Sequence, residues 1–147
     1  MKKLVLTVCA VLLIALPAFG DCDGSAKAMV AKGVAHIADV GPEQAASDFM
    51  TPGGAFIEGD KYLLFYKYDG TCLALGARPE IAGKNRWDVH DPDGVYQIRE
   101  MVKSAKAGGG WVKYKYANPK TGKVQFKKTW VQPVPGMDAF VGCGVYY

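Results

Sequence analysis

The sequence lacks the short motifs that mark the common catalytic and cofactor sites. It contains no Gly-x-Ser-x-Gly nucleophile elbow, no His-Glu-x-x-His zinc motif and no Gly-x-x-x-x-Gly-Lys-Ser/Thr phosphate loop. The glycine run at residues 108–110 follows a predicted helix, whereas a phosphate-binding loop precedes one. No spacing pairs a cysteine with a histidine as nucleophile and base. We therefore expect no catalytic residues and no cofactor, and predict that the chain is not an enzyme.

Histidine is scarce, which argues against a metal site. The two histidines, His36 and His90, lie far apart, and His36 falls near the apolar stripe of a predicted helix, which suits helix packing. A zinc site needs more ligands at suitable spacing. The aspartates between residues 88 and 93 do not follow the Asp-x-Asp-x-Asp-Gly pattern of a calcium loop. We expect no bound metal.

Long apolar runs are also missing, except at the N-terminus. There two lysines precede the apolar run 4–16, and the small residues of 17–20 end it. The run has about thirteen residues, whereas a membrane-spanning helix needs roughly 20. We predict that residues 1–20 are a signal peptide cut after Gly20, so that the mature chain, residues 21–147, is periplasmic or secreted and not inserted in a membrane. An uncleaved anchor is the alternative.

Charge and cysteine content constrain the partners only loosely. Loss of the two signal lysines lowers the formal charge of +4 by two, and the other lysines are spread along the chain, so we expect no nucleic-acid partner. The mature chain keeps Cys22, Cys72 and Cys143, and one disulfide would suit an oxidising compartment. The spacing leaves the pairing open, and no Cys-x-x-Cys motif points to a redox pair.

What the sequence does contain is the hydrophobic pattern of one α+β domain. Apolar residues recur at steps of three and four over 23–50, where Gly41-Pro42 interrupts the helix, and again over 95–107. Asp69-Gly70 lies between two strand-like segments and predicts a hairpin over 61–75. Short loops join the later strands, which makes neighbouring strands antiparallel. The expected strands are 61–68, 71–75, 111–116, 123–131 and 139–147.

Six short motifs, taken in order, resemble the single-Cache family of extracytoplasmic sensor domains, in its second type. They are Tyr68-Asp-Gly-Thr71, Gly83-Lys-Asn85, Asp91-Pro-Asp-Gly94, Gly110-Trp-Val-x-Tyr114, Trp130-Val131 with Val134-Pro-Gly136, and Phe140-Val-Gly-Cys-Gly-Val-Tyr146. The resemblance implies a PAS-like fold, with an antiparallel five-stranded sheet, a long N-terminal helix and a short helix between the second and third strands. It also implies a chemotaxis-like sensor that binds small ligands, often carboxylates.

Aromatic and basic residues of the strands and of the long connection are the candidate ligand-binding residues. Aromatic walls with a few well-placed donors are typical of small-ligand pockets, and basic side chains neutralise an anion. The candidates are Tyr66, Arg78, Trp111, Tyr114, Tyr116, Lys127, Lys128 and Trp130. The alternative is that the aromatic residues are ordinary core and that the charges are solvated.

Two adjacent lysines, Lys127 and Lys128, point to opposite faces of their predicted strand. The alternation groups Lys128 with Phe126 and Trp130, and a lysine among apolar neighbours is a candidate for holding an anion, so the pattern favours Lys128. The resemblance instead implies Lys127 as the family's strand lysine. A β-bulge would reconcile the two.

Two functions remain open at this point. The first is a free-standing periplasmic module that binds a small organic anion, between its sheet and the connection 76–94, and signals to a membrane receptor or kinase on another chain. The second is a structural or interaction protein of the envelope whose pocket is filled by side chains and binds nothing. The segment 136–140 motivates the second function, because it lacks the tryptophans that the family often carries there.

Overall fold

The computed structural model describes residues 21–147, so the predicted signal peptide, residues 1–20, lies outside the described residues. Its helices are α1 (Cys22–Val40), α2 (Pro42–Phe49), the 3-10 helix η1 (Pro79–Ile81) and α3 (Gln97–Lys106). Its strands are β1 (Ile57–Glu58), β2 (Lys61–Lys67), β3 (Cys72–Leu75), β4 (Gly110–Ala117), β5 (Val124–Pro133) and β6 (Ala139–Tyr146). In the described part of the chain, no helix has both the length and the apolar character needed to cross a membrane.

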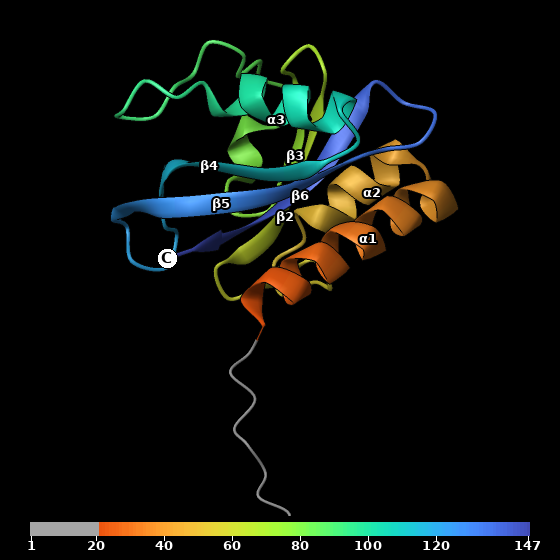
Figure 1. Ribbon diagram of the computed structural model, residues 1–147. Coiled ribbons are helices and arrows are strands. Elements are labelled where there is room, and N and C mark those ends of the chain that lie inside the picture. The colour runs from red at the N-terminus through yellow and green to blue at the C-terminus, as the bar shows by residue number, and fades with distance from the viewer. Residues whose placement is uncertain (1–20) are drawn as a thin grey trace, which may run out of the picture.

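The strands form one antiparallel sheet (Figure 1). Its order is β1-β2-β6-β5-β4, and β3 also pairs with β2. β1 and β3 pair with successive parts of β2, at residues 61–62 and 64–66. All five predicted strands are present, and the prediction of a PAS-like α+β fold is confirmed. β1 was not predicted, because a strand of two residues carries no readable alternation.

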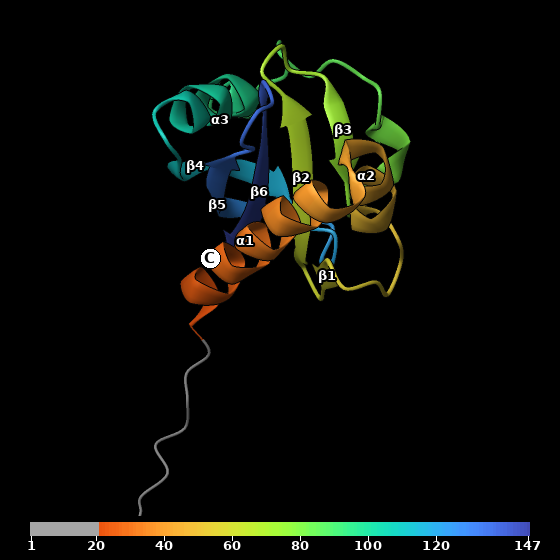
Figure 2. The ribbon, with the colours of Figure 1, turned by 90° about the vertical axis from the view of Figure 1, so that its right-hand side faces the viewer.

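Helices cover the two faces of the sheet separately (Figures 1 and 2). α1 packs on β6 and β5, and α3 packs on β4 and β5 from the opposite side. The buried side chains accordingly form two cores. Alternation divides β2 between them: Leu63 and Phe65 belong to the face under α1, and Tyr62, Leu64 and Tyr66 to the face under α3. We call these the α1 face and the α3 face.

α1 is a regular helix because its apolar residues form one stripe. The buried residues of this stripe are Ala26, Val30, Gly33 and Ile37. Gly33 permits a close approach to the sheet, since a Cβ at this position would lie 2.6 Å from the Cδ1 atom of Leu63. The helix is therefore seated directly on β2.

The long connection between β3 and β4 is fastened to the edge of the sheet by one aspartate. The carboxylate of Asp91, only 5% exposed, accepts hydrogen bonds from the backbone N–H groups of Asp93 and Val95, each at 2.9 Å. It also accepts one from the backbone N–H of Lys115 on β4, at 2.8 Å. These three bonds hold the connection and α3 over the α3 face, where the candidate site lies.

Candidate ligand-binding site

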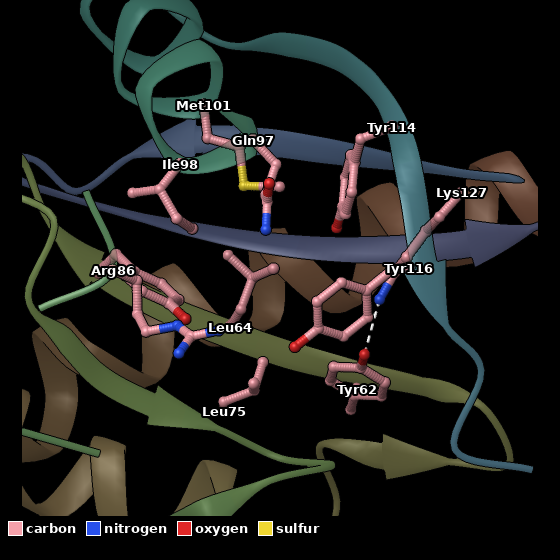
Figure 3. A pocket seen from close by; sticks show the side chains of 11 residues that line it. Tyr62, Leu64, Leu75, Arg86, Gln97, Ile98, Met101, Tyr114, Tyr116 and Lys127 are labelled. Atoms are coloured by element: carbon pink, nitrogen blue, oxygen red, sulfur yellow. Dashed lines mark hydrogen bonds between the residues drawn. The ribbon is translucent and has the colours of Figure 1, made fainter. Parts of the chain in front are cut away.

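A small cavity lies on the α3 face of the sheet, below α3 (Figure 3). Leu64 and Leu75 form one apolar side, and Ile98 and Met101 of α3 form the other. The polar part of the wall consists of four tyrosines, a glutamine, an arginine and a lysine, and none of the eleven lining residues is an aspartate or glutamate. The free volume is about 20 Å³, which is enough for water but little more.

Lys127 of β5 lies at one end of this cavity with only 1% of its surface exposed. Its Nζ donates hydrogen bonds to the hydroxyl oxygens of Tyr62, at 2.7 Å, and Tyr146, at 3.3 Å. The ring centroids of Tyr62, Tyr116 and Tyr146 lie 4.3, 5.2 and 4.6 Å from this nitrogen. Among residues 21–147, Lys127 forms no ion pair. Its ammonium is thus held by neutral phenols alone, which only partly replace water.

Burial controls the protonation of this cluster. It lowers the pKa of Lys127 to about 7, against a weaker opposing influence of Cys143 and Asp60. The pKa values of the phenols shift in the other direction. Burial raises the pKa of Tyr62 far above its ordinary range and that of Tyr146 to about 12. The hydroxyls therefore remain neutral while Lys127 exchanges its proton near neutral pH, so a bound anion would favour the charged lysine.

Gly144 of β6 makes the room that Lys127 occupies. A Cβ at this position would overlap the Cε atom of Lys127 and lie 2.8 Å from the Oγ1 atom of Thr129. Thr129 in turn shares a hydrogen bond of 2.8 Å with the hydroxyl of Tyr114. Gly144 was not among the predicted site residues. The available signal was a glycine inside a predicted strand, which often marks a close approach of another group.

The opposite end of the cavity is lined by Arg86, which the sequence analysis did not select. Its backbone N–H donates to the carbonyl of Gly70 at 2.8 Å, which fixes it beside the β2–β3 turn. Burial raises the pKa of the nearby Tyr66, and the positive charge of Arg86 opposes that rise. The arginine predicted from the same connection, Arg78, lies outside the cavity lining, where its Nε pairs with Glu80 at 2.9 Å. Arg78 therefore lies outside the lining of this cavity, and its role in ligand binding stays a prediction.

Three other candidates lie on the α1 face, behind the sheet. Trp111 and Trp130 pair edge to face, with ring centroids 5.5 Å apart, and pack against the core under α1. The Nζ atom of Lys27 on α1 lies 4.5 Å from the Trp130 ring. Lys128 donates a 2.6 Å hydrogen bond to Asp23 of α1. These residues are thus helix-packing contacts that lie outside the lining of this cavity, and their role in ligand binding stays a prediction.

The regular pairing of β5 explains this separation. β5 pairs with β4 and β6 without a register shift, so no bulge brings Lys127 and Lys128 to one face. The pattern argument that favoured Lys128 is wrong, because the α1 face is open at this point, where Phe126 is 53% exposed. The candidates that do line the cavity are Tyr66, Tyr114, Tyr116 and Lys127.

The remaining reactive side chains do not gather into a site. Cys22, Cys72 and Cys143 are all free, the first exposed and the others buried in different cores, so no disulfide joins them. Within residues 21–147, no three histidine, cysteine or acidic side chains come together as metal ligands would. His36 pairs with Asp48 of α2 at 2.7 Å, which is a contact between helices.

Comparison with known proteins places the chain among sensory domains. The sensor histidine kinase MctS of Rhizobium johnstonii is 38% identical over 87 residues, which are 59% of this chain and only 19% of that kinase. A methyl-accepting chemotaxis protein from Vibrio parahaemolyticus has a TM-score of 0.75 at 21% identity, over 84% of this chain and 87% of its own. A Cache chemosensory domain solved for its recognition of carboxylic acids has a TM-score of 0.67 at 22% identity, over 84% and 86%.

The two solved structures establish the fold, and a family model establishes the family. The model described as single Cache domain 2 matches residues 43–147, which is well over half of the chain and includes every strand and the whole cavity wall. This protein therefore belongs to the single Cache domain 2 family of sensory domains.

Proposed function

We propose that this protein is an extracytoplasmic sensor module that binds a small organic carboxylate in the cavity on the α3 face, without catalytic activity of its own. The observation that carries the proposal is Lys127, a buried lysine at the cavity wall that forms no ion pair in residues 21–147. A bound carboxylate would supply the missing counter-ion. It would also accept charge-assisted hydrogen bonds, which are roughly twice as strong as neutral ones.

The charge of the wall favours an anion over an amine or an amino acid. The lining contains a lysine and an arginine but no acidic side chain, so a ligand ammonium group would find no opposite charge. The hydroxyl of Tyr62 already accepts from Lys127 and can donate to a carboxylate oxygen, whereas the hydroxyl of Tyr146 donates to the carbonyl of Ala117 at 3.0 Å. We therefore propose that the four tyrosines and Lys127 select for a negatively charged ligand.

The cavity must widen to admit an organic ligand, because its free volume is only about 20 Å³. Met101 is unbranched and adaptable, and Tyr116 is half-buried on the edge strand β4, so these two side chains are the ones we expect to move. The same small volume favours the second candidate function, an envelope structural or interaction protein whose pocket is filled by its own side chains. The ligand screen described below separates the two.

The place of action and the partner follow from the predicted leader and the relatives. Cleavage after Gly20 would release residues 21–147 into the periplasm. The matched relatives are a sensor histidine kinase and a chemotaxis protein, which supports a membrane receptor or kinase on another chain as the partner. We propose that binding is passed on through α1, which packs on the opposite face of the same sheet.

A ligand screen tests the proposed function. The purified protein is melted with acetate, propionate or butyrate, and with ethylamine or glycine as ligands of the wrong charge. We expect the carboxylates alone to raise Tm, by the usual linkage of binding to unfolding. Lys127→Met should abolish the rise, whereas Lys128→Met, which removes the same charge from the other face, should preserve it.

The opposite result would favour the second function. If none of the three acids raises Tm while a partner protein is captured from an envelope extract in a Lys127-independent way, the cavity is not a carboxylate site. A rise with ethylamine or glycine equal to that with propionate would also contradict the role assigned to Lys127.

A further inference from the structure

The cavity carries positive charge at two ends, and only one of them is explained by a single carboxylate. Lys127 and Arg86 are the two basic residues among the eleven that line it. Figure 3 shows their side chains on opposite sides of Leu64, with the ammonium beside Tyr62 and the guanidinium beyond Leu64. A ligand with one negative group would neutralise one end and leave the other without a counter-ion.

Arg86 is free to bind a ligand. In the described part of the chain its guanidinium forms no ion pair, unlike Arg78 and Arg99, which pair with Glu80 and Asp88. Its backbone is nevertheless held firmly by the bond to Gly70. A fixed backbone with an unpaired fork of N–H donors suits bidentate binding of a carboxylate.

The backbone next to Arg86 is fixed on both sides. The Asn85 side chain donates to the carbonyl of Asp69 at 2.8 Å and accepts from the backbone N–H of Trp87 at 2.9 Å. The arginine is therefore presented to the cavity by an ordered turn, so that little chain entropy is lost when it binds.

The spacing along β2 sets the length of the ligand. Tyr62, Leu64 and Tyr66 lie on one face of this strand, with Lys127 bonded to Tyr62 and Arg86 close to Tyr66. Four residues of strand span about 13 Å at the usual rise. An extended diacid of four or five carbons, the two carboxylate carbons included, spans about 12 Å when a hydrogen bond is added at each end. The methylene groups of such a ligand would lie over Leu64.

We propose that the ligand of this cavity is a short linear dicarboxylate, with one carboxylate at Lys127 and the second at Arg86. This inference rests on the proposed function of the cavity as a carboxylate site. Arg86 is then the residue that decides between one and two carboxylates. The cavity along β2 is polar at both ends and apolar in the middle, which matches a ligand with two carboxylates joined by methylene groups.

Matched acids test this inference by isothermal titration calorimetry. Succinate is compared with butyrate, and glutarate with valerate, since each pair differs by one carboxylate at equal carbon number. We expect the diacid of each pair to bind about ten- to a hundredfold more tightly, because this is the usual contribution of a hydrogen bond to a charged group. Arg86→Gln should weaken binding of the diacid by about this factor and binding of the monoacid much less, so that the preference for the diacid is lost.

Two further variants serve as controls. Lys84→Gln removes one positive charge from an exposed position of the same connection and should keep the preference, which excludes a general charge effect. Arg86→Lys keeps the charge without the fork and should retain only part of the preference. Thermal unfolding of Arg86→Gln verifies that the variant is folded.

The outcomes separate this inference from the proposed function. If butyrate and valerate bind wild-type protein as tightly as succinate and glutarate, or if Arg86→Gln weakens both members of a pair equally, the dicarboxylate assignment is overturned while the carboxylate site stands. If none of the four acids binds and acetate and propionate do not bind either, both proposals fail; if only acetate or propionate binds, the dicarboxylate assignment alone is overturned.

Discussion

Lys127 and Lys128 are neighbours on β5, yet the two faces of the sheet give them opposite environments. On the α3 face, Lys127 is 1% exposed and surrounded by phenols, and its pKa falls to about 7. On the α1 face, Lys128 keeps about a quarter of its side chain in solvent and pairs with Asp23. The difference teaches that residue type and local sequence do not decide which lysine is buried. What decides it is the layer that covers each face.

The largest difference between the two faces should appear in stability against pH. Above about pH 7 the unfolded chain holds more protons than the folded one, because an unfolded lysine titrates at about 10.4 and folded Lys127 at about 7. From about pH 6 to about pH 8.5, the free energy of unfolding of wild type should rise by about 2 kcal/mol relative to Lys127→Met. Urea denaturation across this range measures the rise. Lys128→Met should follow wild type, and an unchanging gap between wild type and Lys127→Met would contradict the lowered pKa.

The second comparison concerns the glycine that each face uses for close packing. Gly144→Ala should cost about 2 to 3 kcal/mol, since its Cβ would press on both Lys127 and Thr129 within a regular strand. Gly33→Ala should cost less, about 1 kcal/mol, because the nearest atom is the movable end of Leu63. Denaturant unfolding gives both values. Lys127→Ala, which removes the Cε atom, should cost less stability in the Gly144→Ala background than in wild type; an equal cost in both backgrounds would show that the lysine is not what the glycine accommodates.

The pH dependence of ligand affinity sharpens the comparison further. A bound carboxylate favours the charged form of Lys127, so affinity should be nearly constant from about pH 6, where both succinate carboxylates are ionised, to about pH 7, and should fall by up to about tenfold per pH unit above pH 7. Calorimetric titration with succinate in buffers of different ionisation enthalpy should detect proton uptake above the same pH. Lys128→Met should leave the profile in place. Equal affinity at all these pH values would mean that the ligand does not contact Lys127.

The smallest effect should come from the ion pair on the α1 face. Asp23→Asn removes the charge opposite Lys128 at a partly exposed site, where such pairs contribute less than about 1 kcal/mol. Thermal unfolding at low and high salt measures this contribution, which should shrink as salt rises. A loss comparable to that of Gly144→Ala would mean that Asp23 anchors α1 more strongly than its exposure suggests.

Local patterns predicted the elements well because each element carries its own signal. The stripe of Ala26, Val30 and Ile37 defines α1, and the Asp69-Gly70 turn defines the β2–β3 hairpin. Both signals lie within a few residues, so no knowledge of the rest of the chain is needed. The two-residue strand β1 was missed for the converse reason, since it exists only through its pairing with Lys61 and Tyr62.

The candidate site was predicted only in part. Tyr114 and Lys127 both line the cavity as proposed, but only Tyr114 came from strand alternation, since the alternation favoured Lys128 and the family resemblance implied Lys127. Arg86 was missed and Arg78 chosen in its place, because both lie in the connection 76–96, where no repeat shows which side chain faces inward. Hydrogen bonds to the distant β2–β3 turn decide that point.

The sequence by itself determined that Lys127 and Lys128 point to opposite faces, because successive residues of a strand always do. Only the tertiary structure decided which face is closed. α3 and the connection, tied to β4 through Asp91, seal the ammonium of Lys127 among phenols, while α1 leaves that of Lys128 near solvent. The physical reason is that alternation is a property of one strand, whereas the burial that shifts a pKa depends on segments far away in the chain.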